Sequence, residues 1–199
     1  MIRLIASDID GTLLPYDETV MPQRLFPLIR RLRERNILFC PASGRQYHSM
    51  RTLFAPVADE MCFLCENGAV LYGPGTEEGA PRLSKTLLPR QEALALSRAI
   101  MDIPGCDVII EGQNLNYLCG CGLELVHEMA VNHGNLVTMV DRPEDVPEEI
   151  VKIAAYCPNG MDGPAALLAP RWGEPFHMAV AGLVWLALQG DRLSNRIFI

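Results

Sequence analysis

SDIDGTLL, residues 7–14, places two aspartates two positions apart where an apolar run ends. Residues 2–7, IRLIAS, form a short run that is rich in branched apolar side chains, which is typical of a buried parallel strand. In open α/β sheets, ligands bind at the carboxyl ends of such strands. Asp8 and Asp10 are therefore expected at that edge of a sheet. Gly11 allows a sharp exit from the strand, and Thr12 offers a hydroxyl and a backbone N–H to an anion.

The two carboxylates leave three interpretations open. Neighbouring carboxylates repel each other, so Asp8 and Asp10 suit a compensating cation or a shared proton. Hard oxygen ligands favour Mg²⁺, and the same pair of side chains favours a nucleophile beside a general acid. Asp-Gly is also a common turn dipeptide, so the spacing alone is compatible with a plain turn.

Strand and helix patterns alternate up to residue 72. Leu25, Ile29 and Leu32 recur at helical spacing, with arginines on the opposite face. The expected strands are residues 2–8, 37–45 and 61–72, and the expected helices are residues 21–36 and 46–58. The second strand is expected to run into a Ser-Gly turn, and the third to contain a loop at Asn67-Gly68. This order predicts a right-handed parallel α/β unit with its loops gathered at one edge of the sheet.

The composition of the chain changes at residue 73, where glycine and proline become frequent. Residues 73–82, GPGTEEGAPR, predict a linker or the tip of a hairpin. Beyond them we expect helices at 89–102, 123–134 and 164–170, and strands at 106–112, 116–121, 135–140, 150–156 and 176–182. The second part of the chain is therefore predicted to be an α/β domain of its own.

A candidate anion site follows the second expected strand. Pro41-Ala42-Ser43-Gly44-Arg45 brings Ser43 to the same sheet edge as Asp8. A serine hydroxyl and the backbone N–H groups at the start of a helix bind anions. Phosphate fits a place where carboxylates, a divalent cation and such a hydroxyl meet. The sequence therefore favours chemistry on a phosphoryl group.

Three motifs together resemble a known family. DIDGTLL at 8–14, ASGR at 42–45 and ENGA at 66–69 are similar to the haloacid dehalogenase (HAD) superfamily, specifically its Cof-like phosphatases with a large α/β cap. The resemblance implies an α/β fold with a Rossmann-like parallel-sheet core and an inserted α/β cap. It places the core at residues 1–80, the cap at 81–186 and an atypical tail at 187–199.

The resemblance also implies roles for the two aspartates. Asp8 would be the nucleophile that forms an aspartyl-phosphate, and Asp10 the general acid and then the general base. Mg²⁺ would be held by the Asp8 carboxylate and the Asp10 carbonyl. The substrate would be a small phosphorylated metabolite, a phosphate ester such as a sugar phosphate.

Five further residues complete the implied site. Ser43 would hold the transferring phosphoryl group, with Thr12 and Gly44 also binding phosphate. Arg45 and Asn67 would lie near the crevice between core and cap, where the cap selects the substrate.

The chain departs from the family pattern in its last residues. Such enzymes use a lysine after the cap and a Gly-Asp-containing acidic loop, whereas Lys85 and Lys152 are the only lysines here and no lysine follows AVAGLVWL. The tail QGDRLSNRIFI is only faintly similar to that loop. Losing one such electrostatic contact often slows a reaction by about 10²- to 10³-fold. We therefore expect impaired turnover, and a non-catalytic or truncated phosphate-ligand-binding product and a sugar phosphomutase remain alternatives.

Composition excludes several other classes of function. A net charge of −7 argues against nucleic-acid binding. The longest late apolar stretch, residues 178–188, is too short to span a bilayer, and MIRLIASD is too short for a secretory signal. Seven cysteines are expected as free thiols in a reducing cytoplasm, with Cys62 and Cys65 packed in a core. An unpaired edge of the first strand is compatible with a homodimer.

Overall fold

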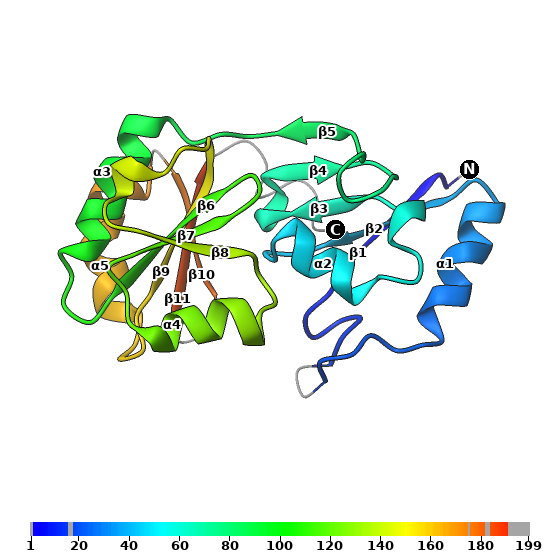
Figure 1. Ribbon diagram of the computed structural model, residues 1–199, viewed down its shortest axis with the longest axis horizontal. Coiled ribbons are helices and arrows are strands. Elements are labelled where there is room, and N and C mark those ends of the chain that lie inside the picture. The colour runs from blue at the N-terminus through cyan, green and yellow to red at the C-terminus, as the bar shows by residue number, and fades with distance from the viewer. Residues whose placement is uncertain (1, 16–17, 175, 182–183, 191–199) are drawn as a thin grey trace. The chain divides into compact units, whose positions relative to one another are not determined.

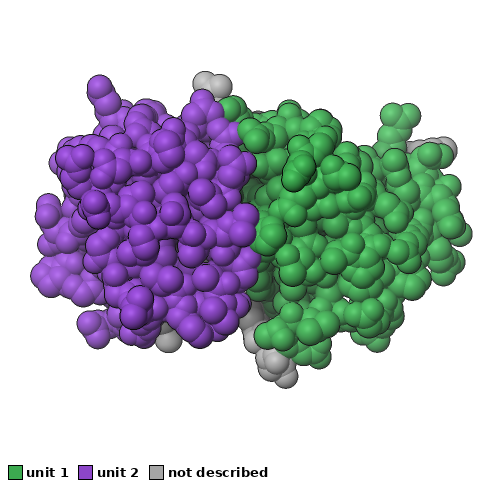
Figure 2. All heavy atoms as spheres, viewed as in Figure 1, with its two compact units in different colours: residues 1–85 green, residues 86–199 purple. Residues whose placement is uncertain are grey.

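The chain folds into two compact units, residues 1–85 and residues 86–199 (Figure 2). The computed structural model describes residues 2–15, 18–174, 176–181 and 184–190. Both units combine helices with strands, so the predicted α/β fold class is confirmed.

The first unit is built on a five-stranded sheet in the order β1-β2-β3-β4-β5 (Figure 1). Its strands are β1 (Leu4–Asp8), β2 (Leu38–Ala42), β3 (Phe63–Cys65), β4 (Val70–Tyr72) and β5 (Arg82–Lys85). Pairing is parallel from β1 to β3, as expected, and antiparallel from β3 to β5. Among the described residues β1 pairs with β2 alone, and the pairing of this edge with a second copy stays a prediction.

The helices of the first unit are shorter than the sequence predicts. They are α1 (Leu25–Glu34) and α2 (Tyr47–Leu53), with 3₁₀ turns η1 (Ala58–Glu60) and η2 (Glu66–Gly68). Pro27 stands in the first turn of α1, where its missing N–H costs no helical hydrogen bond. Pro56 disfavours helical backbone at Ala55, which explains why α2 does not continue to residue 58.

The third expected strand, residues 61–72, is two antiparallel strands. Three successive residues between them have left-handed backbone: Glu66 (φ 53°), Asn67 (φ 54°) and Gly68 (φ 94°). This turn reverses the chain, so that Cys65 at the end of β3 lies opposite Val70 at the start of β4. The expected loop at Asn67-Gly68 is therefore present, but it folds the strand back on itself.

Residues 73–81 form the tip of the β4–β5 hairpin, which confirms one of the two predictions for this stretch. Because β5 pairs with β4, residues 81–85 belong to the first unit. The predicted boundary between residues 80 and 81 thus comes five residues early. The tip is tied to α2, where the Arg51 guanidinium donates to the Gly75 carbonyl at 3.0 Å.

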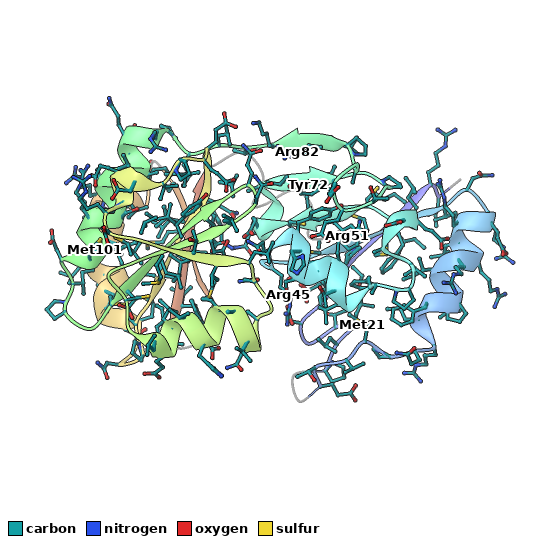
Figure 3. All side chains as sticks on the ribbon, in the orientation of Figure 1. Met21, Arg45, Arg51, Tyr72, Arg82 and Met101 are labelled. Carbon is teal, nitrogen blue, oxygen red and sulfur yellow. A yellow bond between two sulfur atoms is a disulfide. The ribbon has the colours of Figure 1, made fainter. Side chains whose placement is uncertain are left out.

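Aromatic side chains support the first sheet from the side of α2. The Tyr47 and Tyr72 rings stack with their centroids 3.8 Å apart, and Tyr47 meets Phe63 edge-on at 5.5 Å. Arg51 donates to the Tyr47 hydroxyl at 3.1 Å, and Figure 3 labels Arg51 and Tyr72 on neighbouring elements of this unit. This packing fixes α2 on the sheet that carries the candidate site.

The second unit is built on a six-stranded sheet in the order β10-β11-β9-β6-β7-β8 (Figure 1). Its strands are β6 (Asp107–Gly112), β7 (Asn116–Cys119), β8 (Val137–Val140), β9 (Ile150–Tyr156), β10 (Phe176–Ala181) and β11 (Trp185–Gly190). Its helices are α3 (Arg90–Met101), α4 (Leu123–His127) and α5 (Asp162–Trp172), with a π-helical turn η3 (Glu128–Asn132) and a 3₁₀ turn η4 (Pro143–Asp145).

Helices cover both faces of the second sheet. Apolar residues of α3 and α5 share one core with sheet residues: Leu96, Ile100, Leu168, Trp172, Val108, Ile110 and Ile153. Leu125 of α4 and Met129 of η3 pack on the opposite face against Ile109, Leu118 and Ala154. No helix among the described residues has both the length and the apolar character that a membrane span requires.

Strand β11 includes residues 187–190, the first residues of the predicted tail. It lies between β10 and β9, with Ala187 opposite Ala179 and Ala154. These four residues are thus part of the second sheet. The rest of the tail, with Asp191 and Asn195, lies outside the described residues.

The cysteines do not all remain free thiols, which corrects the prediction. Cys106 and Cys157 form a disulfide with their Cα atoms 4.4 Å apart. Antiparallel pairing of Asp107 with Tyr156 brings the flanking cysteines together, although they are 51 positions apart in the chain. Cys62 and Cys65 take no part in the disulfide and are buried, which confirms their packing in a core.

Candidate active site

Asp8 is the last residue of β1 and lies opposite Ala42, the last residue of β2. The two strands are parallel, so the segments that follow them leave the sheet at the same edge. The sequence therefore predicts correctly that the loops after residues 8 and 42 share one edge of a sheet.

A tight turn follows β1. The backbone N–H groups of Thr12, Leu13 and Leu14 all donate to the Ile9 carbonyl, at 3.1, 2.9 and 2.9 Å. Ile9 is fully buried, which anchors the turn, and Gly11 adopts a φ of 81° that other residues rarely take. The Thr12 hydroxyl then donates to Oδ2 of Asp8 at 3.3 Å. The Thr12 hydroxyl thus lies beside the carboxylate that the resemblance implies as the nucleophile.

Asp10 is bound by Arg45 from the loop after β2. Nη2 of Arg45 donates to Oδ1 of Asp10 at 2.7 Å, and Nε donates to Oδ2 at 3.1 Å. The pair is accessible to solvent in part, with 40% of the Asp10 side chain and 24% of the Arg45 side chain exposed. A fork of two hydrogen bonds fixes the plane of the carboxylate as well as its position. Figure 3 labels Arg45 in the first unit.

Ser43 joins the same cluster. Its hydroxyl donates to Oδ2 of Asp10 at 3.3 Å and accepts the backbone N–H of Arg45 at 3.3 Å. Its own N–H donates to the Leu64 carbonyl at 3.0 Å, which ties the loop to β3. Ser43 is buried, so these contacts hold its hydroxyl in one place beside the carboxylate.

The turn after β3 packs on the loop after β2. The N–H of Asn67 donates to the Ser43 carbonyl at 3.0 Å, and the N–H of Glu66 donates to the Arg45 carbonyl at 3.2 Å. The side chain of Asn67 lies over Gly44, because a Cβ on Gly44 would come within 2.5 Å of the Asn67 Oδ1. Gly44 is therefore the residue that permits the two loops to touch.

The sequence places Glu66 in the motif at 66–69 but predicts no role for its side chain. The structure shows it buried, with left-handed backbone and a hydrogen bond to the loop that carries Arg45. The signal in the sequence is the run Glu-Asn-Gly after a strand, because Asn and Gly are the residues that most readily adopt left-handed backbone.

The charges of the described site are two carboxylates and one guanidinium. Of the two lysines, Lys85 ends β5, four strands away from β1 in the sheet order. Lys152 lies in the second unit, where it pairs with Glu111 at 2.8 Å. Among the described residues of the first unit, Arg45 is thus the cation bound to Asp10.

A divalent cation would find oxygen ligands here. The described residues hold no group of three or more His, Cys, Asp and Glu side chains that could bind a metal. Mg²⁺ keeps several water ligands, however, and usually takes only one or two carboxylates together with substrate phosphate. Because Arg45 occupies the Asp10 carboxylate, the Asp8 carboxylate is the acidic side chain of this pair that is left to bind a cation.

Comparison with known proteins identifies the family. The family model for haloacid dehalogenase-like hydrolases matches residues 5–153. The chain belongs to the haloacid dehalogenase-like hydrolases. The predicted family is thereby confirmed, and the match includes all three motifs at the strand ends.

Two curated relatives of this HAD chain are phosphatases. It is 29% identical over 148 residues to the 5-amino-6-(5-phospho-D-ribitylamino)uracil phosphatase YbjI of Escherichia coli (strain K12), covering 73% of this chain and 53% of that protein. It is 33% identical over 89 residues to the HMP-PP phosphatase of Serratia proteamaculans (strain 568), covering 45% of this chain and 31% of that protein. The chain thus spans about half the length of the first relative and about a third of the second.

Solved structures share the fold of this HAD chain. A crystal structure from Eubacterium rectale superposes with a TM-score of 0.83 at 25% identity, covering 97% of this chain and 72% of that one. The HAD subclass IIB sugar phosphatase BT4131 superposes with a TM-score of 0.76 at 14% identity, covering 96% of this chain and 71% of that one. The second likeness concerns the fold alone.

Proposed function

We propose that this chain transfers the phosphoryl group of a small phosphate ester to Asp8 and then to water. The observation that carries the proposal is the cluster of Asp8, Asp10, Thr12, Ser43 and Arg45 at one sheet edge. A phosphatase needs a nucleophile, a proton donor and groups that bind the phosphoryl oxygens, and these side chains supply all three.

In the first step, an oxygen of the Asp8 carboxylate attacks phosphorus, and the bond from phosphorus to the ester oxygen breaks. The leaving oxygen takes a proton from Asp10, so the alcohol departs neutral and Asp8 becomes an aspartyl-phosphate. The Thr12 hydroxyl, 3.3 Å from Oδ2 of Asp8, is placed to donate to the nucleophile or to a phosphoryl oxygen. The Ser43 hydroxyl, 3.3 Å from Oδ2 of Asp10, is placed to bind another phosphoryl oxygen.

In the second step, water attacks phosphorus and the bond to Asp8 breaks. Asp10, which gave up its proton in the first step, takes the proton from that water, so inorganic phosphate leaves, Asp8 is again a carboxylate and Asp10 is again protonated. The Arg45 guanidinium donates to both Asp10 oxygens in this structure. At least one of these hydrogen bonds must break before Asp10 can give or take a proton. Arg45 is therefore also placed to turn toward the phosphoryl group.

A bound Mg²⁺ would neutralise charge on the phosphoryl oxygens and on the nucleophile. The residues that would hold it are Asp8, through its carboxylate, and Asp10, through its carbonyl. Two hard oxygen donors and open positions for water and phosphate suit this ion.

The substrate class is a small phosphorylated metabolite such as a sugar phosphate. The proposal is supported by family membership and by two phosphatases among the relatives, one of which acts on a phosphorylated ribityl compound. Turnover is expected to be slow, because no lysine among the described residues of the first unit lies near the two aspartates in the sheet order.

The experiment is release of inorganic phosphate from p-nitrophenyl phosphate with and without Mg²⁺. We expect weak release that requires Mg²⁺ and that Asp8→Asn abolishes. Asp102→Asn, at an exposed position directly after α3 in the second unit, is the matched control that leaves it unchanged. Release that survives Asp8→Asn would contradict the role of Asp8. Fast release abolished by Asp8→Asn would instead contradict the expected impairment.

A labelled sugar phosphate separates the alternatives. Label in inorganic phosphate supports hydrolysis, and label moved to another position of the sugar supports a mutase. Binding of the sugar phosphate without release of label supports a chain that keeps the pocket without turnover.

A further inference from the structure

Helix α5 presents one side to the core of the second unit and the opposite side to solvent. Leu168 and Trp172 are its buried side chains, in the core that α5 shares with α3 (Figure 1). Successive residues of an α-helix are rotated by about 100°, so six other positions of α5 share the side opposite these two. All six are exposed, and we call them the α5 face: Asp162, Gly163, Ala166, Leu167, Pro170 and Arg171.

The middle of the α5 face carries no polar side chain. Leu167 is 69% exposed, and Gly163, Ala166 and Pro170 lie on the same side of the helix. A Cβ at Gly163 would meet no atom of the described residues within 4 Å, so the helix is uncovered there. A surface helix normally turns charged side chains toward water, as α1 does with Arg31. A helix that is apolar on both sides is instead typical of one that a further partner covers.

The two charges of the α5 face stand at its ends. Asp162 is the first residue of α5, and Arg171 is the last but one. The Arg171 guanidinium lies over the Trp172 ring, 4.5 Å from its centroid. Its N–H groups point outward in its own plane, so a guanidinium held in this way can still donate to a carboxylate. Both charges suit the helix dipole, which accounts for their signs but not for the apolar surface between them.

The sequence of the α5 face is complementary to itself when two copies of the helix lie antiparallel. With a two-fold axis between positions 166 and 167, Asp162 of each copy lies opposite Arg171 of the other. The same axis sets Leu167 opposite Ala166, a large side chain against a small one. Two ion pairs would thus flank an apolar centre, which is the pattern of an interface that one patch forms with itself.

We propose that two copies of this chain associate through the α5 face, antiparallel and related by a two-fold axis. A lipid surface suits the face less well, because Leu167 is its one large apolar side chain and membrane-surface helices combine several with a basic polar face. A helix of 11 residues gives a small interface, so the dimer is weak, with a dissociation constant of about 10–100 µM. This surface is distinct from the edge of β1, and the proposal does not rest on the phosphoryl chemistry of the first unit.

The experiment is sedimentation equilibrium of the whole chain at concentrations below and above that range. We expect a reversible equilibrium between monomer and dimer. Leu167→Lys places an ammonium beside the two-fold axis and should weaken the dimer at least about tenfold. Leu123→Lys, the same change at an exposed position of α4, is the matched control and should leave the dimer unchanged. A chain that stays monomeric throughout, or equal effects of the two variants, would overturn the proposal.

Charge reversal tests the antiparallel arrangement. Asp162→Arg and Arg171→Asp each bring like charges together at both ends of the interface, so either variant alone should remain monomeric. An equal mixture of the two variants restores opposite charges at both ends, and we expect a mixed dimer as tight as that of the unaltered chain. A misfolded helix would not recover on mixing. Failure of the mixture to associate would overturn the proposal.

Two further controls separate the α5 face from other surfaces. Glu34→Arg and Arg31→Asp make the same changes of charge on α1, and each variant should dimerise as the unaltered chain does. Leu4→Lys puts a charge on β1, whose edge is the other surface expected to pair with a second copy. Association that Leu4→Lys abolishes and Leu167→Lys leaves intact would overturn the proposal in favour of that edge.

Discussion

Arg45 controls how Asp10 can act. Its guanidinium donates to both oxygens of Asp10, while the Ser43 hydroxyl donates to one of them. These contacts hold the Asp10 carboxylate in the orientation of an acceptor. Asp8, by contrast, accepts a single hydrogen bond from Thr12 among the side-chain contacts described for it. The two aspartates are alike in the sequence and differ because of their partners.

Replacing Arg45 by lysine should reduce activity although the charge is kept. An ammonium cannot form the fork that fixes the plane of the carboxylate. We expect Arg45→Lys to lower the rate of phosphate release by about 10- to 100-fold at saturating ester. Arg24→Lys, an exposed position just before α1, is the matched control and should behave as the unaltered chain. Equal rates for the two variants would show that the fork is not needed.

Gly44 and Asn67 form a pair that stability measurements can test. A Cβ at position 44 would lie 2.5 Å from Oδ1 of Asn67, so Gly44→Ala should lower the free energy of unfolding by about 1–3 kcal/mol. Asn67→Gly removes the clashing amide, and glycine accepts the φ of 54° at that position. The double variant should therefore be more stable than the sum of the single changes predicts. Urea unfolding of the unaltered chain, the two single variants and the double variant measures this effect. If the two changes in the free energy of unfolding simply add, the contact between position 44 and Asn67 is not the cause of the destabilisation.

At the scale of elements, the strand ends organise both units. The parallel ends of β1 and β2 gather the candidate site, and the reversed chain at η2 adds Asn67 to it. In the second unit, antiparallel pairing of β6 with β9 aligns Glu111 with Lys152 and brings Cys106 next to Cys157. One register thus determines an ion pair and a disulfide at opposite ends of the same two strands.

The disulfide should stabilise the second unit. A crosslink between residues 51 positions apart restricts the unfolded chain, and such bridges typically contribute about 2–4 kcal/mol. We expect a reducing agent to lower the midpoint of urea unfolding. The double variant Cys106→Ala/Cys157→Ala should unfold at the lower midpoint and not respond to the reducing agent. Cys121→Ala, which removes a free thiol, should keep the response; a loss of response there would assign the effect to another cysteine.

At the scale of the whole molecule, burial governs the response of stability to pH. Desolvation raises the pKa of the Cys40 thiol from 9.0 to about 12 and the pKa of the Tyr72 phenol from 10.0 to about 12. It also raises the pKa of Tyr117, where the neighbouring Glu148 carboxylate adds to the effect. Both units therefore keep protons in the folded state that the unfolded chain releases more readily.

Stability should fall in alkaline solution. A group whose pKa is raised by folding contributes its full stability below its unfolded pKa and loses it as the pH rises through its folded pKa. The free energy of unfolding should therefore decrease from about pH 9 toward about pH 12, as Cys40 and Tyr72 lose their protons. Urea unfolding at a series of pH values measures the slope. Cys40→Ala should flatten it, whereas Cys121→Ala is expected to change it less; a slope that is identical in all three chains would exclude Cys40 as a cause.

The sequence predicts well wherever the signal is local. Alternating strand and helix patterns locate most helices and strands, and strand β9 is predicted with the bounds that it has, residues 150–156, whereas strands β5 and β11 are not predicted. The motifs at Asp8 and Ser43 indicate one sheet edge, because the ends of parallel strands must meet there. Helix ends are predicted less well, since the prolines at positions 27 and 56 act on single backbone positions that a hydrophobic pattern does not register.

By itself, the amino-acid sequence determined the α/β class, the family and the candidate residues for phosphoryl chemistry, because each depends on neighbours along the chain. Tertiary structure decided the pairing of Asp10 with Arg45, the contact of Asn67 with Gly44, the Cys106–Cys157 disulfide and the Glu111–Lys152 ion pair. Each of these joins residues from different strands or loops. Register and chain reversal bring them together, and neither is encoded by the spacing of the residues alone.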